Sequence, residues 1–384
     1  MKGSDMSYID DILEVASKKQ DEIKRKIFLL GINEKEALEK ISSGLVEIPS
    51  EIPAHLQPEK VAAVDGGSYP ISMLGFEMYF IKSYSVRLVY NSSSKIYTEK
   101  EESRIVDVDI LIPPSMSQDR ITVYRQISEI RSMYDSLKME FFTLADGSLE
   151  SLIARPAHMK LKELDREDSS LCDIVSELIE KEERDDVAIA SKGYIEREMS
   201  SNTERAKVIE LVEKAVRLSR LFDMVAKGQY LAFVTKTGRS NNLFKLPLPD
   251  QYVLTKLVAG TGYIIETVSE SLDAVIGQEL SSLCNTRESA RSVSFISGYA
   301  RLSPGAPFLK IQLLSPFASE KGSLVKAYEE LILKLASISI ADGYPFPLLL
   351  AHQRAHIRKS TAEMIIDAFG FREELSGREE VDVL

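Results

Sequence analysis

The sequence predicts an α/β protein in which a mixed β-sheet is flanked by helices. Segments with the two-residue alternation of β-strands follow one another between residues 60 and 112. A segment with the periodicity of an amphipathic helix comes next, at 118–138. An apolar run at 140–145 then ends in an aspartate, as the first strand does. Strands, a helix and a further strand in this order indicate one sheet that is covered by helices.

The length and charge of the chain limit its class. It has 384 residues, enough for one large domain with insertions or for two smaller ones. No run approaches the ~18 consecutive apolar residues that a membrane span needs, and the N-terminus lacks the pattern of a secretory signal. We therefore expect a cytoplasmic protein with no membrane partner. The net charge of −11 argues against a nucleic-acid partner for the molecule as a whole, although basic side chains can still cluster in one groove.

The two cysteines of the sequence are Cys172 and Cys284. They are too few, and too far apart along the chain, for a disulfide framework or a zinc site. This cysteine content suits a reducing cytoplasm.

The N-terminal segment is predicted to be helical. Residues 7–30 have apolar side chains near helical spacing, and a second helix is expected at 34–42. Three prolines between residues 48 and 61 mark a linker before the first strand.

Three strands follow without a helix between them, which predicts an antiparallel meander. The first is the apolar run Lys60–Val64, and the second and third are the alternating segments 79–90 and 105–112. Pro113 and Pro114 end the third strand.

The first and fourth strands both end in Asp-Gly, at Asp65 and Asp146. In a sheet that places these strands side by side, the two carboxylates lie together at one edge. Two carboxylates a few Å apart cannot both ionise without cost, and Mg²⁺ or Mn²⁺ relieves that repulsion through hard oxygen ligands. The glycines let the chain turn at once and leave room for a metal or a phosphate. The alternative is that both motifs are simple turns.

The remaining segments predict further helices and strands. The expected helices are 160–184, 203–226, 323–341 and 347–368, and the expected strands are 187–191, the start of 230–242, 292–302 and 307–314. Strand, strand, strand, helix, strand is the order of the RNase H-like fold. We therefore expect an RNase H-like mixed sheet with a helical insertion at about 155–230.

The helix at 118–138 contains a candidate for a third carboxylate. Glu129 lies 17 residues before Asp146, but a helical wheel places it roughly 100° from the centre of the apolar stripe. Periodicity alone predicts a solvated surface acid at this position.

The segment "ADGYPFPLLLAHQRAH" places Tyr344 eight residues before His352. His352 and His356 lie one helical turn apart, a spacing that can bind zinc. No glutamate follows the first histidine and no cysteine is near, so zinc is not expected. Beside the carboxylates, His352 would be a fourth metal ligand or a proton carrier.

Four motifs resemble the archaeal and bacterial NurA nucleases. They are "AVDGGS" at 63–68, "LADGSL" at 144–149, "FVTKTGRS" at 233–240 and "DGYPFPLLLAHQ" at 342–353, and the resemblance extends from about Val61 to Phe371. It implies an RNase H-like fold with a manganese-dependent site. It also implies resection of DNA 5′ ends with the hexameric ATPase HerA, by a homodimer.

Carried over residue by residue, the resemblance gives Asp65, Glu129 and Asp146 as metal-binding acids, with His352 completing the metal site. Glu129 is matched by its spacing and its helix rather than by a motif, so another acid remains an alternative. The resemblance implies Mn²⁺ or Mg²⁺ as cofactor, with two ions expected.

The same resemblance gives Tyr344 and Lys236 as further catalytic residues, with Lys192 as the second choice for the lysine. Metal-activated water would attack a DNA phosphodiester, Lys236 would offset charge on the phosphate, and Tyr344 would bind the phosphate or stack on a base. The sequence has "DGGS" where the family more often has Asp-Gly-Ser, which shifts Ser68 but not Asp65.

The predicted organisation is an N-terminal helical arm at 1–50, a nuclease domain at 51–371 and a C-terminal tail at 372–384. The predicted function is a 5′–3′ DNA exonuclease for double-strand break repair, with endonuclease activity on single strands left open. Two rival interpretations remain. One is an ATPase or phosphotransferase of the actin-like fold, and the other is a non-catalytic partner subunit of a DNA translocase.

Overall fold

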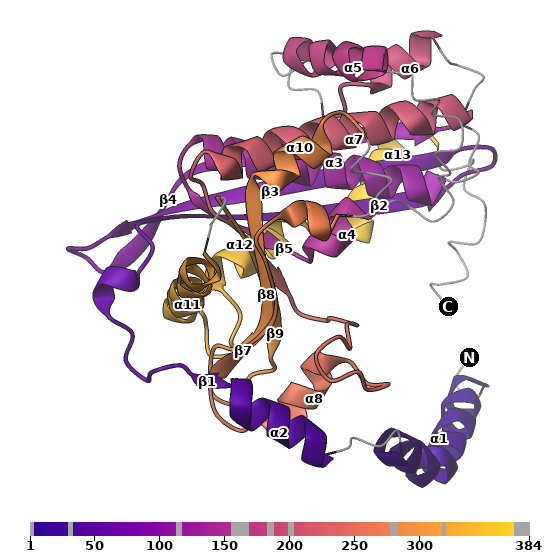
Figure 1. Cartoon of the computed structure of the whole chain (residues 1–384). Coiled ribbons are helices and arrows are strands. Elements are labelled where there is room, and N and C mark those ends of the chain that lie inside the picture. Colours follow the sequence, from indigo (N-terminus) through magenta and orange to yellow (C-terminus); the bar gives the residue numbers. More distant parts are fainter. Residues whose placement is uncertain are drawn as a thin grey trace.

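The computed structural model describes residues 4–29, 34–112, 117–154, 169–182, 188–198, 203–276, 283–316 and 320–371 (Figure 1). The predicted C-terminal tail at 372–384 lies outside these residues. Within them, no helix is both long and apolar enough to cross a lipid bilayer.

One mixed sheet organises the described part of the chain. Its nine strands have the order β1-β7-β8-β9-β6-β5-β2-β3-β4. The strands are β1 Val46–Glu47, β2 Lys60–Ser72, β3 Glu77–Asn91, β4 Ile96–Leu111, β5 Phe142–Asp146, β6 Leu231–Thr235, β7 Gly262–Ser269, β8 Val293–Arg301 and β9 Leu309–Pro316.

The centre of the sheet is parallel and its flanks are antiparallel. β5 pairs in parallel with β2 on one side and with β6 on the other. The pairs β2–β3 and β3–β4 are antiparallel, as are β6–β9, β9–β8 and β8–β7. The predicted meander is confirmed, and so is the prediction that the first and fourth strands lie side by side.

Strand β2 does not turn at its glycines, so the expected sharp turn after Asp65 is wrong. β2 continues to Ser72 because β3 pairs with it along its whole length, from Lys60↔Val89 to Ser72↔Glu77. Its parallel partner β5 ends earlier, with the pair Val64↔Ala145. Asp65 therefore lies within a strand, at the point where one neighbour ends.

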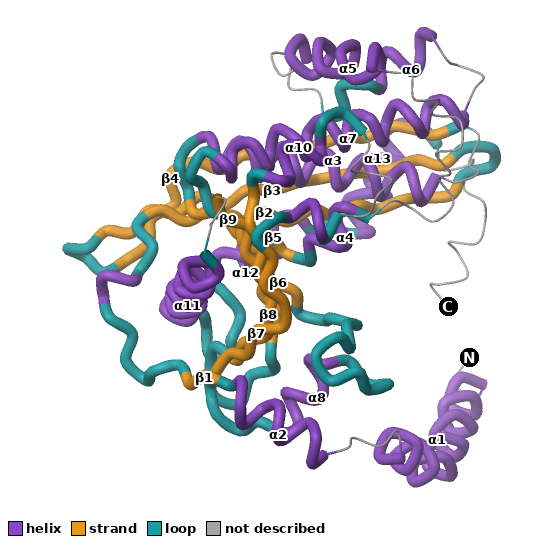
Figure 2. Tube along the Cα trace, in the orientation of Figure 1, coloured by secondary structure: helices purple, strands orange, loops and turns teal. Residues whose placement is uncertain are grey.

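Helices cover both faces of the sheet (Figures 1 and 2). One face packs against α3 and α7 in a core that includes Val64, Phe233 and Phe222. The other face packs against α11 and α12 in a core that includes Ala63 and Leu348. The described α-helices are α1 Ser4–Leu29, α2 Glu34–Gly44, α3 Ser117–Lys138, α4 Leu149–Ile153, α5 Ser169–Glu182, α6 Lys192–Glu198, α7 Thr203–Ala226, α8 Asp250–Leu257, α10 Thr286–Arg291, α11 Lys321–Ser337, α12 Phe346–Ala355 and α13 Lys359–Phe369.

Several expected elements differ from the structure. The described part of the predicted strand 187–191 is a turn that leads into α6. The single helix expected at 347–368 is two helices, α12 and α13, with residues 356–358 between them. The segment between β6 and β8, which gave no clear periodicity, contains α8, β7 and α10.

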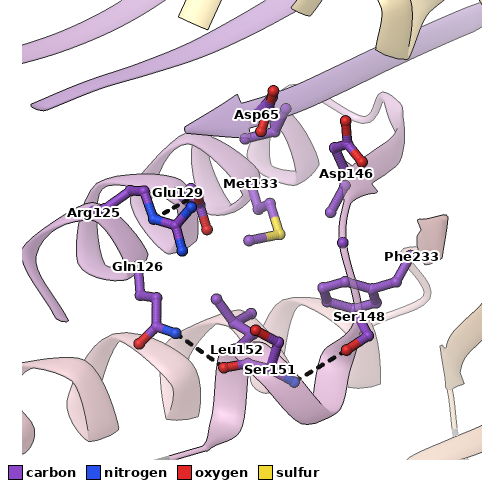
Figure 3. A pocket seen from close by; sticks show the side chains of 13 residues that line it. Asp65, Arg125, Gln126, Glu129, Met133, Asp146, Ser148, Ser151, Leu152 and Phe233 are labelled. Atoms are coloured by element: carbon purple, nitrogen blue, oxygen red, sulfur yellow. Dashed lines mark hydrogen bonds and ion pairs between the residues drawn. The ribbon is translucent and has the colours of Figure 1, made fainter. Parts of the chain in front are cut away.

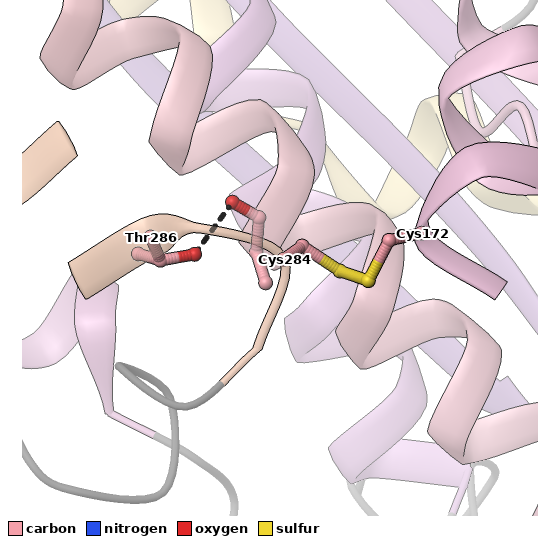
Figure 4. The surroundings of a disulfide bond; sticks show 4 residues. Cys172, Cys284 and Thr286 are labelled. Carbon is pink, nitrogen blue, oxygen red and sulfur yellow. Dashed lines mark hydrogen bonds between the residues drawn. A yellow bond between two sulfur atoms is a disulfide. The ribbon is translucent and has the colours of Figure 1, made fainter. Parts of the chain in front are cut away.

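The two cysteines form a disulfide bond, which corrects the expectation from their number and separation. Cys172 of α5 is bonded to Cys284, 112 residues further along the chain and just before α10 (Figure 4). Both cysteines pack against a cluster of buried side chains from α5, α6 and α7, including Val175, Ile179 and Val212. The bond thus ties α5 to the segment that precedes α10 and β8.

Candidate metal centre

Three side chains with metal-binding atoms converge where β2 and β5 separate. Asp65 comes from β2, Asp146 is the last residue of β5, and His352 comes from α12. The Nδ1 atom of His352 lies 2.8 Å from Oδ2 of Asp65 and 3.7 Å from Oδ2 of Asp146. One ligand atom from each residue lies within 4.8 Å of the others. Two carboxylates and an imidazole suit a divalent cation such as Mn²⁺.

The turn after β5 is held in place by its neighbours. The N–H of Gly147, which has a φ of 116°, donates to the carbonyl of Val234 at 3.0 Å. The hydroxyl of Thr235 donates to the carbonyl of Gly147 at 2.7 Å, and the side chain of Gln312 accepts from Leu149 N–H at 2.9 Å. These hydrogen bonds hold the backbone on the C-terminal side of Asp146 in place.

The electrostatics of the cluster disfavour two bare carboxylates. Burial and then the Asp65 charge raise the pKa of Asp146, whereas Lys236 and His352 lower it. The Nζ atom of Lys236 lies 3.5 Å from Oδ2 of Asp146. A bound cation would act in the same direction as Lys236 and with a larger charge.

Tyr344 adds a buried polar atom beside the carboxylates. Its ring lies 4.0 Å, centroid to Nζ, below Lys236. Burial and then the Asp146 charge raise the pKa of Tyr344. No described atom lies in hydrogen-bonding geometry with its buried hydroxyl. The hydroxyl nevertheless interacts with the Asp146 carboxylate closely enough to lower the pKa of that carboxylate, and a phosphate oxygen or a metal-bound water would offer it a better-aligned acceptor.

Glu129 reaches the cluster from α3, which lies on the face of the sheet opposite to α12. It is not the solvated surface acid that periodicity predicts, because only 14% of its side chain is exposed. Its pKa is raised from 4.5 to about 7, because the effects of burial and of the Asp65 and Asp146 charges exceed those of Arg125 and Lys214, which lower it. Its carboxylate lies 3.7 Å from Nε of Arg125. The grouping of close metal-binding atoms contains the other three predicted ligands but not Glu129.

This pKa gives a prediction for the metal-free protein. Because the folded pKa of Glu129 exceeds the ordinary value of 4.5, its contribution to stability is fully present below pH 4.5 and is lost as the pH rises through about 7. The loss is at most about 3 kcal/mol, since the side chain is partly exposed. We expect urea unfolding in EDTA to show a smaller loss of stability between pH 5 and pH 8 for E129Q than for wild type. The exposed control E177Q should retain the wild-type loss.

The two glycines after Asp65 provide clearance on both faces of β2. A Cβ atom on Gly66 would lie 2.6 Å from Cγ of Glu129, and one on Gly67 would collide with the carbonyl oxygen of Ala355, the last residue of α12. The glycines therefore let α3 and α12, which bear Glu129 and His352, approach the strand that bears Asp65. This is their physical role in place of the turn that the sequence predicted.

Alanine at these positions should have two different effects. G66A displaces a flexible side chain, so we expect a loss of metal-dependent activity of about 10–100-fold with little loss of stability. G67A meets backbone, so the free energy of unfolding should also fall, by about 1–3 kcal/mol. Activity assays and chemical denaturation separate the two. G322A on α11 is the control, because an added Cβ there meets no atom within 4 Å.

A cavity of about 140 Å³ opens beside Asp65 and Asp146 on the α3 face (Figure 3). Its walls are α3 and the short helix α4, and its lining includes Arg125, Gln126, Ser148 and Ser151. Sequence reasoning did not identify these four residues. The position of Ser148 three residues before Ser151, as an N-cap, was a local signal for α4. The other three gave no pattern of their own.

The structure also distinguishes the two candidate lysines. Lys236 lies beside Asp146 and Tyr344. Lys192 lies at the start of α6, where it forms ion pairs with Asp107 and Asp109 of β4. Lys236 is thus the lysine next to the cluster.

Two other residues discussed from the sequence lie at the margin of the site. Ser68 is exposed on β2, and His356 is exposed at the C-terminal end of α12.

The chain is similar to known proteins over most of its length. The family model for the NurA domain matches residues 59–357. The DNA double-strand break repair nuclease NurA of Sulfurisphaera tokodaii is 24% identical over 366 residues, which cover 93% of this chain and 94% of that protein. The protein of the same name from Saccharolobus solfataricus is 24% identical over 325 residues, 82% of each chain.

Solved structures have the same fold. The crystal structure of the NurA nuclease from Sulfolobus solfataricus aligns with a TM-score of 0.68 at 19% identity, over 94% of this chain and 96% of that one. A crystal structure of NurA with manganese aligns with a TM-score of 0.63 at 15% identity, over 91% and 98% of the two chains. Since the family model spans more than half of the sequence, this chain belongs to the NurA family.

Proposed function

We propose that this protein is a metal-dependent DNA nuclease that hydrolyses phosphodiester bonds. The observation that carries the proposal is the convergence of Asp65, Asp146 and His352, with Lys236 beside them, where two parallel strands end. The relatives named as DNA double-strand break repair nucleases support the same activity. The role that we assign is 5′–3′ resection of broken DNA ends.

The proposed cofactor is Mn²⁺ or Mg²⁺, as two ions. Asp65, Asp146 and His352 would hold the ions, with Glu129 as a further ligand from α3. The donor set fits, because hard carboxylate oxygens and an imidazole suit Mn²⁺. The solved structures with the same fold include one of NurA with manganese and one of NurA bound to dAMP and manganese. When bound, the ions lower the pKa of a water nucleophile and stabilise charge on the phosphate.

The other residues of the site would act on the substrate. Lys236 is half exposed and points toward Asp146, so it would pair with a phosphate oxygen. The hydroxyl of Tyr344 would donate to the same phosphate. Arg239 is exposed three residues after Lys236, in a loop held by a hydrogen bond from Gly238 N–H to Gln251, and would contact the DNA backbone. These contacts predict weak DNA binding that falls as salt rises.

The catalytic unit that we propose is of the RNase H-like type. The strand order β4-β3-β2-β5-β6, with β3 antiparallel to its neighbours, supports this assignment. The unit would lie within a domain at 51–371, with a helical insertion at about 155–230 and an N-terminal arm at 1–50. The arm contains α1 and α2, and α1 exposes Ile9, Ile12 and Leu13.

The proposed partners are DNA, a second copy of the chain and a hexameric ATPase of the HerA type. Handing over DNA from a motor would reduce the affinity that the nuclease itself needs. This accounts for a net charge of −11 on a DNA enzyme.

The proposal is tested by digestion of DNA labelled at the 5′ or the 3′ end, with Mn²⁺, with Mg²⁺ and in EDTA. We expect metal-dependent release of short products from the 5′ end. ATP hydrolysis without DNA cleavage would favour an actin-like ATPase. Absence of both activities, with retained binding to the ATPase, would favour a non-catalytic subunit.

Removing the hydroxyl of Tyr344 should separate stability from activity. Y344F deletes a buried hydroxyl that interacts with Asp146 without good hydrogen-bonding geometry, so we expect the free energy of unfolding to change by less than about 1 kcal/mol. The cleavage rate should fall about tenfold or more, because the transition state loses a donor. Denaturation and single-turnover cleavage measure the two effects. A tyrosine with a purely structural role would show no change in rate.

A further inference from the structure

A buried lysine lies behind the candidate metal centre. The side chain of Lys214 on α7 is 0% exposed. Its Nζ donates to Oε1 of Gln126 at 2.7 Å and to the carbonyl oxygen of Ala154 at 2.7 Å. One nitrogen atom, Nζ of Lys214, therefore joins α7 to α3 and to the C-terminal end of α4.

Gln126, which accepts the hydrogen bond from Lys214, also contacts α4 itself. Nε2 of Gln126 donates to the carbonyl oxygen of Ser151 at 2.9 Å, and Ser151 N–H donates to the hydroxyl of Ser148 at 3.1 Å (Figure 3). Both ends of the Gln126 amide are thus engaged, and α4 is held at two carbonyl groups. We call Lys214, Gln126 and their two acceptors on α4, Ser151 and Ala154, the lysine clamp.

The lysine clamp joins the two walls that bear metal-binding acids. Gln126 precedes Glu129 by one turn of α3, and both line the cavity beside Asp65 and Asp146. The helix α4 begins three residues after Asp146. The clamp therefore sets the separation between the wall that bears Glu129 and the turn that follows Asp146.

A role in positioning the helices explains why an ionisable side chain, Lys214, is buried at this place. Desolvation of a buried ammonium is costly, and an apolar side chain of the same shape usually gives equal or greater stability. Stability alone therefore does not explain Lys214.

We propose that Lys214 is a positioning residue whose clamp holds α3 and α4 so that Glu129 can join Asp65 and Asp146 around one divalent ion. This inference rests on the proposed metal-dependent nuclease function. Lys214 itself touches neither metal nor DNA in this role. It acts through Gln126 and α4.

The test measures Mn²⁺ binding directly, from the electron paramagnetic resonance signal of free Mn²⁺, in K214M and Q126L. Each variant breaks the clamp at a different member. We expect the Mn²⁺ dissociation constant to rise about 10–100-fold in both. The double variant should lose no more than the stronger single one, because the two residues act as a unit. The affinity for DNA in EDTA should stay at the wild-type value.

R217M is the matched control. Arg217 is a buried cation on the same helix, but it donates to Glu213 at 2.8 Å rather than to the clamp. R217M should lose stability and keep the wild-type Mn²⁺ affinity. If Q126L stays folded and binds Mn²⁺ as wild type does, the inference fails, even where K214M unfolds. Lost cleavage with unchanged Mn²⁺ affinity in the clamp variants would overturn it as well.

The wild-type protein separates this inference from the proposed function. A wild type that neither binds Mn²⁺ nor cleaves DNA contradicts the proposed function. A wild type that does both, beside clamp variants that bind Mn²⁺ equally well, contradicts the inference alone.

Discussion

Replacing Asp146 by asparagine should abolish Mn²⁺-dependent DNA cleavage, with a loss of rate of at least about 1,000-fold. Asp146 is the one acid in the cluster that also contacts Lys236 and faces Tyr344 among the described residues. Asparagine keeps the shape of the side chain but removes the charge that binds a cation. The loss should appear in single-turnover assays at saturating DNA.

Metal-free D146N should nevertheless be as stable as the wild type or more so. Burial and the Asp65 charge already raise the pKa of Asp146, so the ionised form is disfavoured before metal binds. The control D223N changes an exposed acid on α7 and should leave both rate and stability unchanged. Cleavage by D146N at the wild-type rate would show that our assignment of the site is wrong.

Removing the disulfide should have the largest effect on stability. The bond between Cys172 and Cys284 closes a loop with a sequence separation of 112. We expect the double variant C172S/C284S to lose about 3–5 kcal/mol of unfolding free energy, mainly because the unfolded chain gains freedom. Mn²⁺-dependent cleavage at moderate temperature should persist, since the cysteines pack in a cluster that contains none of the candidate catalytic residues.

The same measurement with a reductant provides the control. Dithiothreitol should lower the denaturation midpoint of the wild type to that of the double variant, and it should not shift the midpoint of the variant. A wild-type midpoint that does not respond to full reduction would contradict a stabilising role for the bond.

Local periodicity was sufficient to predict the meander and α3, because each of those strands and that helix has one apolar face against the core. It also predicted the adjacency of the strands that end in Asp65 and Asp146, since order along the chain limits how such strands pair. The continuation of β2 through its glycines was not predictable in this way. It depends on pairing with β3, which is a contact between segments.

The burial of Glu129 was missed for a related reason. A helical wheel finds one apolar stripe, but α3 packs against the sheet on one side and against α7 on the other, and its contacts are partly polar. Ser132 and Ser136 meet Ser83 and Ser85 of β3 at 2.9 and 2.8 Å. Buried serines of this kind look like a solvated face in the sequence, so the wheel understates how much of α3 is covered.

The disulfide was also not predictable from local patterns, because it joins segments that lie far apart in the sequence. Cys172 and Cys284 come from segments whose approach depends on how α5 packs against α7. Neither spacing nor composition contains that information.

The position of Asp65 within a continuous strand distinguishes it from the histidine and the other carboxylate of the candidate metal centre. Hydrogen bonds to β3 on both sides of Asp65 prevent its backbone from moving without the sheet. His352 lies on a helix, and 54% of its side chain is exposed. Any adjustment to the shape of a bound ligand is therefore expected from the His352 side chain and not from the backbone that bears Asp65. The α12 backbone is itself held against β2 by the close approach of Ala355 to Gly67.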